Sequence, residues 1–281
     1  MGQIVVITGL ADGMGRHVAQ MLARAGHSVA GFDVDSGGIK SLEKELSEIG
    51  GDHLLETIDI TDRPAILKFC DRVLARFGRV DTVLSNVGIG FFSPFEEVNL
   101  EKALKCLEIN VIGAASIFQA FLPSMRERRT GKLIAMSSLV GRIPFPFESI
   151  YSASKFAVTG MMLSLKYEVE PFGIQVALIE PAQVSTTFAA KIHVLPPENS
   201  VYRDRARRFI ERDNELIKTA PTPPVAAAKI MKVIEAEKPA LFNQIDFMSS
   251  FFLWLNQFLP KSIRDAILVN HMNIKVGVGQ K

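Results

Sequence analysis

The sequence predicts a single α/β domain, with a three-layer, doubly wound parallel sheet followed by a C-terminal helical extension. Short runs rich in Val, Ile, Leu and Ala alternate with longer segments whose apolar residues recur at helical spacing. Such runs are typical of parallel strands buried on both faces, and their alternation with helices builds βαβ units. The length of 281 residues fits one large domain, which we divide into a core, 1–190, and a loop region with an apolar extension, 191–281.

Six apolar runs are predicted strands because each is short and aliphatic, and most end in a small or polar residue. In chain order they are Ile4–Thr8, Ser28–Asp33, His53–Asp59, Thr82–Asn86, Lys132–Ser137 and Gln175–Pro181. The segments between them are predicted helices because their apolar residues recur every three or four positions. In chain order they are Arg16–Ala25, Ile39–Ile49, Arg63–Phe77, Leu100–Glu127 and Ala153–Glu170.

The chain changes character beyond residue 190. A charged helix is predicted over Tyr202–Arg212, and a Pro/Thr connector leads to a short predicted helix, Val225–Glu237. Acidic residues at Asp204, Glu211 and Asp213 are interleaved with the arginines of the charged helix. This mixture favours a solvated helix face over a phosphate-binding patch.

The last unusual segment is the apolar tail, Phe247–Leu259, which is shorter than the roughly 20 residues of a membrane-spanning helix. The favoured roles are a cover over a substrate site or packing on a second subunit. Alternatively, the tail lies on a membrane surface with Lys261 and Arg264 toward the lipid headgroups, or it is ordinary core.

Composition excludes several classes of protein. The formal net charge of +2 lacks the strongly basic balance of a nucleic-acid-binding protein. Cys70 and Cys106 are too few for a disulfide framework and fall in predicted helices, which indicates a reducing, cytoplasmic compartment. The histidines and cysteines show no metal-ligand spacing, so no metal is expected. Because the N-terminus leads directly into a strand, no secretory signal is predicted.

A glycine-rich loop, Thr8–Gly15, joins the first strand to the first helix. Gly9, Gly13 and Gly15 allow a tight turn, a close approach of backbone to a pyrophosphate, and packing of the helix on the sheet. The N–H groups at the helix N-terminus attract phosphate. An ordinary strand-to-helix turn is the alternative, but this position favours a dinucleotide site.

Asp33 closes the second predicted strand, at about the spacing where a carboxylate binds the adenosine ribose hydroxyls and repels a 2′-phosphate. Asp12 adds a second negative charge, and Arg16 is the only nearby cation in the sequence. NAD is therefore favoured over NADP. Asp59, followed by Ile60, is a candidate for binding the adenine amino group.

Tyr151 and Lys155 are four residues apart, on one face of a predicted helix. Use of the phenol as a general base requires its pKa to fall by roughly 2 to 3 units, which Lys155 and a positively charged nicotinamide would supply together. Ser138 follows a predicted strand at the sheet edge where ligands bind, and it would hold the reacting oxygen. Ser137 is equally capable chemically, and only the spacing favours Ser138. Asn110 is unfavourable inside a helix unless it faces solvent.

Together these residues resemble the short-chain dehydrogenase/reductase family, over about residues 4–190. The matching positions are Thr8–Gly15, Asp59, Asn86–Gly88, Asn110, Ser138, Tyr151, Lys155 and Pro181. The resemblance implies a Rossmann fold and the catalytic residues Ser138, Tyr151 and Lys155. It further implies that Asn110 kinks its helix and holds a water in the proton relay, that Lys155 binds the nicotinamide ribose, and that Thr186 lies near the carboxamide.

The residues expected to contact the cofactor are Thr8, Gly9, Gly13, Met14, Gly15, Asp33, Asp59, Ile60, Asn86, Gly88, Tyr151, Lys155, Pro181, Val184 and Thr186. The chain departs from the family pattern at three positions. Ser85 and Val87 replace an asparagine and an alanine, a change that should be tolerated. Ala182 replaces a glycine, which affects the expected pose of the nicotinamide.

Four phenylalanines, Phe91, Phe92, Phe145 and Phe188, are expected to form an apolar mouth for the substrate. The sequence thus predicts an NAD-dependent enzyme that interconverts a hydrophobic secondary alcohol and its ketone, of steroid, retinoid, aromatic or fatty type. An NADP-dependent 3-oxoacyl reductase is the alternative enzyme. A non-catalytic dinucleotide-sensing protein is the alternative of another class. A homodimer or homotetramer is expected.

Overall fold

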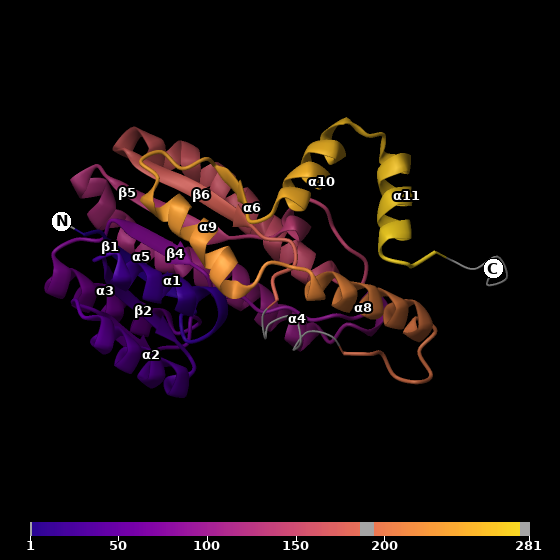
Figure 1. The fold of residues 1–281 in the computed structure, drawn as a ribbon, viewed down its shortest axis with the longest axis horizontal. Coiled ribbons are helices and arrows are strands. Elements are labelled where there is room, and N and C mark those ends of the chain that lie inside the picture. Colours follow the sequence, from indigo (N-terminus) through magenta and orange to yellow (C-terminus); the bar gives the residue numbers. More distant parts are fainter. Residues whose placement is uncertain (1, 186–193, 276–281) are drawn as a thin grey trace.

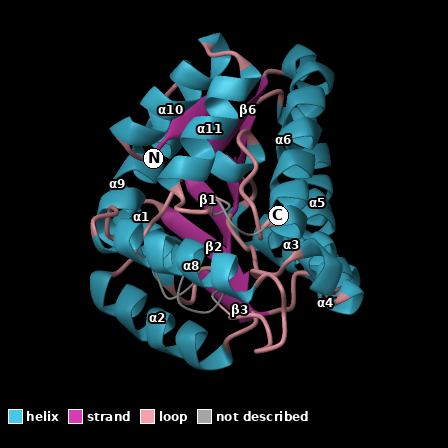
Figure 2. Cartoon of the chain, turned by 90° about the vertical axis from the view of Figure 1, so that its right-hand side faces the viewer, coloured by secondary structure: helices cyan, strands magenta, loops and turns pink. Residues whose placement is uncertain are grey.

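The computed structural model describes residues 2–185 and 194–275, and these form a seven-stranded parallel sheet with helices on both faces (Figures 1 and 2). The strand order is β3-β2-β1-β4-β5-β6-β7, which confirms the doubly wound α/β fold. The strands are β1 (Ile4–Thr8), β2 (Ser28–Asp33), β3 (Leu54–Thr57), β4 (Thr82–Ser85), β5 (Gly131–Met136), β6 (Ile174–Glu180) and β7 (Phe242–Gln244).

The strands β3 and β7 differ most from the prediction, for reasons of pairing, whereas β4, β5 and β6 differ from it by one residue at one or both ends. β3 is shorter than the predicted His53–Asp59, because Thr57 pairs with Asp33 and β2 ends there. β7 was not predicted; it is a three-residue strand that pairs only with β6, and so short a segment has no recognisable period.

Helices cover both faces of the sheet (Figure 2). One face carries α1 (Gly13–Arg24), α2 (Ser36–Ile49) and α9 (Pro223–Glu235), and the other carries α3 (Arg63–Phe77), α5 (Gly113–Arg128) and α6 (Ser149–Val169). Residues that are buried on the helices form one apolar cluster with each face of the sheet. The carboxyl ends of the strands are left uncovered by these helices, and this edge is where open α/β sheets bind ligands.

The predicted single helix Leu100–Glu127 is wrong in one respect. The structure has α4 (Leu100–Leu107), a π-helical turn (Glu108–Ile112) and then α5. The whole segment has the length and composition of a membrane-spanning helix, but its buried side chains, such as Phe121, pack on the sheet. Its apolar character therefore serves the core.

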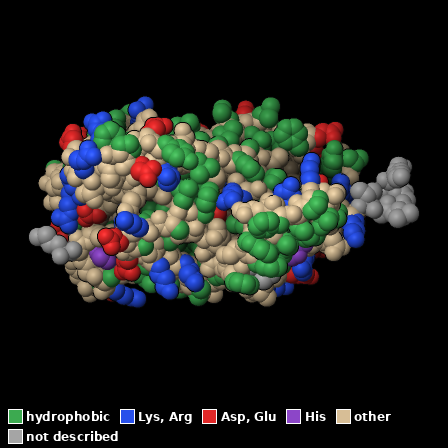
Figure 3. Space-filling view, turned by 90° about the horizontal axis from the view of Figure 1, so that it is seen from above, with side chains coloured by type: hydrophobic (Ala, Val, Ile, Leu, Met, Phe, Trp, Pro, Cys, Tyr) green, Lys and Arg blue, Asp and Glu red, His purple; other side chains and the backbone are tan. Residues whose placement is uncertain are grey.

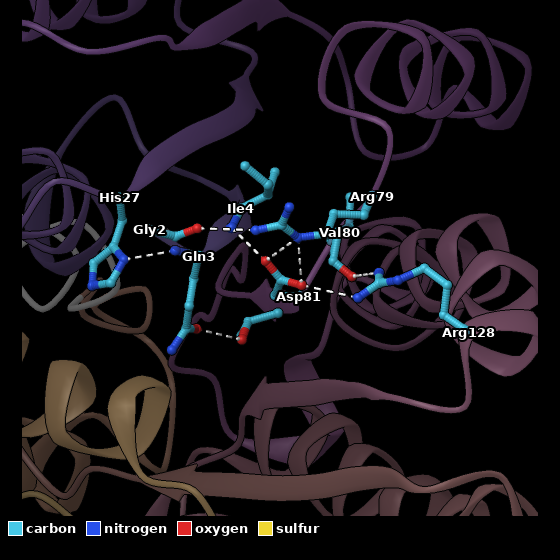
Figure 4. Close-up of polar contacts among 9 residues, drawn as sticks. Gly2, Gln3, Ile4, His27, Arg79, Val80, Asp81 and Arg128 are labelled. Atoms are coloured by element: carbon cyan, nitrogen blue, oxygen red, sulfur yellow. Dashed lines mark hydrogen bonds and ion pairs between the residues drawn. The ribbon is translucent and has the colours of Figure 1, made fainter.

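Asp81, just before β4, forms hydrogen bonds that link β1, β4 and α5 at the amino end of the sheet (Figure 4). Its carboxylate accepts hydrogen bonds from Ile4 N at 2.9 Å, Arg79 Nε at 3.1 Å and Arg128 Nη2 at 3.0 Å. This network fixes the register of β1, β4 and α5 at the end of the sheet opposite the ligand-binding edge.

The C-terminal region adds α8 (Arg203–Lys218), α10 (Phe247–Phe258) and α11 (Lys261–His271). Figure 1 shows α10 and α11 as a hairpin at the end of the molecule where α8 lies. A third apolar cluster around Phe209 joins α8 to Met272 and Ile274 after α11. The remaining described helices are short 3₁₀ turns at Phe95–Glu97, Leu139–Gly141 and Glu170–Phe172.

Candidate functional site

The glycine loop has the geometry of a phosphate-binding turn. Gly9 and Gly13 have positive φ, +71° and +57°, a conformation that favours glycine. A Cβ on Gly15 would lie 2.2 Å from the Gly9 carbonyl oxygen, so α1 packs against the turn only with glycine at that position. Asp12 caps α1 by accepting a hydrogen bond from Gly13 N at 2.7 Å. The loop thus brings backbone N–H groups to the helix N-terminus, as a pyrophosphate requires.

Thr8 and Asn86 hold this loop to the neighbouring strand. The Thr8 hydroxyl accepts hydrogen bonds from Asn86 N at 3.1 Å and Val87 N at 3.3 Å. The Asn86 side chain donates to the Gly9 carbonyl oxygen at 2.7 Å. Thr8 therefore positions the loop instead of lining the cavity beside it.

A cavity of about 480 Å³ opens at the carboxyl edge of the sheet. The residues that line it and that the sequence predicted for the site are Gly9, Gly13, Met14, Asp33, Asp59, Ile60, Asn86, Gly88, Ser138, Phe145, Tyr151, Lys155, Pro181 and Val184. The glycine loop, the acidic residues and the Tyr151 region thus share one elongated space, a donor set that fits a dinucleotide. Thr186 and Phe188 lie outside the described residues.

Two predicted substrate residues lie elsewhere. Phe92 is buried and packs on Phe209, with ring centroids 5.2 Å apart. Phe91 and Phe92 line neither this cavity nor the adjoining one described below, whereas Phe145 lines both. Of the predicted mouth, the described part of the structure brings only Phe145 to the cavities.

Asp33 is fixed at the wall of the cavity by the backbone. Its carboxylate accepts hydrogen bonds from Ala11 N and Asp35 N, each at 3.0 Å. Arg16 is engaged nearby: its guanidinium donates to the Ala11 carbonyl oxygen at 2.8 Å and forms an ion pair with Glu45 at 2.5 Å. The charge at this end of the cavity is therefore negative, as the sequence predicts.

The carboxyl group of Asp59 is stabilised in its charged form. It accepts hydrogen bonds from the backbone N–H of Thr61 at 2.9 Å and from the Thr61 hydroxyl at 2.8 Å. The backbone hydrogen bond is the largest cause of the lowered pKa of this carboxyl group.

Ser138, Tyr151 and Lys155 meet at the other end of the cavity. The Tyr151 hydroxyl forms a hydrogen bond with Ser138, and Lys155 Nζ donates to the Met136 carbonyl oxygen at 2.8 Å. The Ser137 hydroxyl instead bonds to the Thr159 hydroxyl at 2.8 Å. The two adjacent serines, both of which line the cavity, thus have different hydrogen-bond partners.

The residues of the chain alone do not favour a phenolate at Tyr151. Burial, and secondarily the charge of Glu148, raise the pKa of Tyr151 above its ordinary value, while the hydrogen bond to Ser138 opposes this rise. Burial also lowers the pKa of Lys155 to about 8. The lowering of the phenol pKa that proton abstraction requires must therefore come largely from a bound cation.

Asn110 is buried in the π-helical turn and does not face solvent. Its Oδ1 accepts a hydrogen bond from Ile89 N at 2.8 Å, and its Nδ2 donates to the Ile89 carbonyl oxygen at 2.8 Å and to Ser154 Oγ at 2.9 Å. Asn110 therefore connects the loop after β4 to α6, the helix that carries Tyr151. Its role in a proton relay stays a prediction.

Two acidic residues in this wall were missed. Glu148 and Asp213 are 7% and 6% exposed, and both line the cavity with Tyr151. The solvated face predicted for the charged helix is right for Asp204 and Glu211, which are exposed, and wrong for Asp213. The sequence spacing could have predicted this burial. Asp213 comes four residues after Phe209 and three after Ile210, so it shares the buried face of α8 with them.

Glu148 gives a pH-dependent stability prediction. Burial, and secondarily the charge of Asp213, raise the pKa of Glu148 from its ordinary value of 4.5 to about 8. A raised carboxyl pKa stabilises the fold below the unfolded-state pKa, and this stabilisation is lost as pH rises through 8. Glu148→Gln is therefore expected to gain up to about 4 kcal/mol in free energy of unfolding relative to the natural chain between pH 5 and pH 9.

Urea unfolding at pH 5, 7 and 9 measures this difference. Glu211→Gln, an exposed substitution on α8, is the control and should show no comparable pH trend. A difference between Glu148→Gln and the natural chain that stays constant across this range would contradict the assignment of Glu148 as a buried titrating group.

A second cavity, of about 670 Å³, adjoins the first. It lies among the Ile143–Phe145 loop, α10 and α11, and it shares four lining residues with the first cavity: Leu139, Phe145, Ala182 and Gln183. The C-terminal tail therefore borders the space next to the predicted chemical site.

Comparisons with known proteins agree with this geometry. The family model described as short chain dehydrogenase matches residues 3–194. A 3-ketodihydrosphingosine reductase of Bacteroides thetaiotaomicron is 32% identical over 95% of this chain and 96% of its own. Human 17-beta-hydroxysteroid dehydrogenase type 1 is 29% identical over 85% of this chain and 76% of its own.

Solved structures show the same fold. A short-chain dehydrogenase from Streptomyces avermitilis has a TM-score of 0.81 and 29% identity, covering 95% of this chain and 94% of that chain. A short chain dehydrogenase/reductase from Burkholderia phymatum, in complex with NAD, has a TM-score of 0.80 at 22% identity, covering 99% of this chain and 98% of that chain. The chain therefore belongs to the short-chain dehydrogenase/reductase family of oxidoreductases.

Proposed function

We propose that this protein is an NAD-dependent oxidoreductase that interconverts a hydrophobic secondary alcohol and its ketone. One observation carries the proposal: a single cavity joins the glycine loop and Asp33 to Ser138, Tyr151 and Lys155. The larger adjoining cavity supports a hydrophobic substrate. Two relatives named for a ketosphingoid and a hydroxysteroid also support this class of substrate.

The residues divide the chemistry of alcohol oxidation among them. Ser138 holds the reacting oxygen and Tyr151 accepts the hydroxyl proton, while Lys155 positions the nicotinamide ribose. NAD supplies a hydride acceptor and a positive charge that stabilises the phenolate. In ketone reduction Tyr151 returns the proton to the oxygen.

The preference for NAD rests on Asp33. This carboxylate is fixed at the cavity wall, and Arg16 is already bound to Glu45, so a 2′-phosphate would meet negative charge. The alternative is an NADP-dependent 3-oxoacyl reductase. NADP-bound relatives occur among the solved structures of this fold, and titration with both cofactors separates the two proposals.

The outer surface of α10 supports a further contact. Phe247, Phe251, Trp254 and Phe258 are exposed at positions that share one helical face, and Figure 3 shows the hydrophobic patch over α10 and α11. We propose that the inner face of the tail covers the substrate space and that the outer face packs on a second subunit of a cytoplasmic homo-oligomer. Attachment to a membrane surface is the alternative, and vesicle sedimentation beside light scattering separates the two.

Hydride transfer tests the proposed function directly. The full chain is mixed with NAD or NADP and a panel of apolar secondary alcohols, and absorbance of the reduced cofactor is followed. We expect turnover with NAD and a clearly lower kcat/KM with NADP. Binding of NAD without turnover of any alcohol or ketone would favour the non-catalytic dinucleotide sensor.

A further inference from the structure

The acidic wall of the cofactor cavity, formed by Glu148 and Asp213, has no role in the proposed chemistry. Glu148 lies three residues before Tyr151 and lines the same cavity, yet only 7% of the residue is exposed to solvent. No described residue donates a hydrogen bond to its carboxylate or forms an ion pair with it. Asp213, from α8, lines the same wall, and Gln183 Nε2 donates to its Oδ1 at 2.9 Å.

Ionisation of a buried carboxyl group such as that of Glu148 is costly unless a cation or several donors compensate the charge. Here a second carboxyl group adds to the cost, and its charge acts on Glu148. The wall is therefore complementary to a positively charged group that arrives with the ligand. An ammonium group has three N–H donors and can satisfy both carboxylates at once.

The adjoining cavity adds a second, independent requirement. Its walls are mostly aliphatic and aromatic, with Leu255 and Phe252 from α10 and Leu268 from α11. Of its charged wall residues, Arg142 is bound to Glu180, Asp246 to Ser249 and Arg264 to Asn256, whereas Lys261 and Asp265 are exposed to solvent. Its volume is that of a site for a sizeable apolar group.

The two cavities meet at four shared residues, which include Phe145 and Gln183. Gln183 also binds Asp213, so the acidic wall lies beside this junction. A ligand that satisfies both spaces has a cationic group near its reacting carbon and a long apolar chain that passes Phe145. A compact neutral ring system matches only the apolar requirement.

We propose that the substrate is a long-chain amino alcohol or the corresponding amino ketone. Its ammonium group is bound by Glu148 and Asp213, and its alkyl chain lies between α10 and α11. The inference rests on the proposed function and names its substrate class. In oxidation the carbinol C–H bond breaks and its hydride passes to NAD. The hydroxyl proton passes to the Tyr151 oxygen, which leaves the amino ketone and NADH.

Charge recognition is tested with 2-aminododecan-3-ol and its neutral counterpart dodecan-3-ol. We expect kcat/KM to be at least tenfold higher for the amino alcohol. Glu148→Gln and Asp213→Asn should each lower the ratio of kcat/KM for the amine to kcat/KM for dodecan-3-ol by about tenfold. Glu211→Gln, an exposed charge on α8, is the matched control and should change neither value.

Binding provides a readout that does not depend on turnover. Calorimetric titration of the NADH-bound protein with dodecylammonium chloride and with dodecan-1-ol should show tighter binding of the amine, and Glu148→Gln should remove the difference. Unfolding curves of the variants at the assay pH exclude loss of structure as the cause.

The chain-binding cavity is tested by filling it. Leu255→Trp places a larger side chain in the cavity, whereas Gln257→Trp changes an exposed position on the same helix. Leu255→Trp should raise KM for 2-aminododecan-3-ol by about tenfold and leave KM for 3-aminobutan-2-ol unchanged. Gln257→Trp should alter neither.

The outcomes separate the inference from the proposed function. Absence of hydride transfer to every alcohol would contradict the proposed function itself. Turnover of dodecan-3-ol that equals or exceeds that of the amine would contradict only the inference, as would a preference for 3-hydroxydodecanoate. Equal effects of Leu255→Trp on long and short amines would contradict the placement of the chain.

Discussion

Tyr151→Phe is expected to lower kcat by about 10²- to 10⁴-fold, because it removes the one hydroxyl proposed to exchange a proton with the substrate. The phenyl ring keeps the packing of the buried side chain, and Ser138 retains its hydrogen bond to the Pro181 carbonyl oxygen at 3.3 Å. The affinity for NADH should therefore change little. Steady-state kinetics with NAD and a good alcohol measures kcat, and NADH fluorescence measures binding.

Tyr167→Phe is the matched control, since Tyr167 is on the same helix and is 73% exposed. It should retain the activity of the natural chain. If Tyr151→Phe stayed within a few fold of that activity, the proton would travel by another group, and the assignment of Tyr151 would be wrong.

Asp33→Asn is expected to shift the ratio of kcat/KM for NAD and NADP by about 30-fold toward NADP. Two unit charges 4 Å apart interact by about 4 kcal/mol at an effective dielectric constant of 20, and solvent at the cavity mouth leaves about half of this repulsion. Asparagine keeps one of the acceptors that now bind Ala11 N and Asp35 N, so the loop should hold its conformation.

Asp35→Asn is the control for this change. Asp35 caps α2 by accepting hydrogen bonds from Gly37 N and Gly38 N, and asparagine caps helices equally well. The cofactor ratio should be unaffected by this substitution. Unchanged cofactor preference in Asp33→Asn, or a natural chain that already prefers NADP, would show that Asp33 does not determine the choice.

Much of the fold follows from local patterns. The bounds of β1 and β2 agree with the predicted runs, because a strand buried on both faces needs a continuous apolar segment. The glycine loop was predictable for a related reason, since the positive φ values at Gly9 and Gly13 restrict the residues that are tolerated.

Other features depend on partners far along the chain. β7 exists because residues 242–244 meet β6, and β3 ends where β2 ends, so neither boundary is encoded by its own residues alone. The π-helical turn at Asn110 is another case. Its asparagine is stabilised by Ile89 and Ser154, and the apolar spacing around it looks like that of an uninterrupted helix.

In the candidate site, too, some features depend on local sequence and others on tertiary packing. The sequence by itself determined the glycine loop and the Tyr151–Lys155 spacing, because each depends on neighbouring residues along the chain, and these motifs together with others determined the family resemblance. Only the tertiary structure showed that the Ser137 hydroxyl is bound to Thr159 and that Asp213 is buried in the same cavity wall as Glu148. It alone also placed α10 and α11 around a second cavity. These features arise where segments distant in sequence meet, since burial and hydrogen-bond partners are properties of the packed chain.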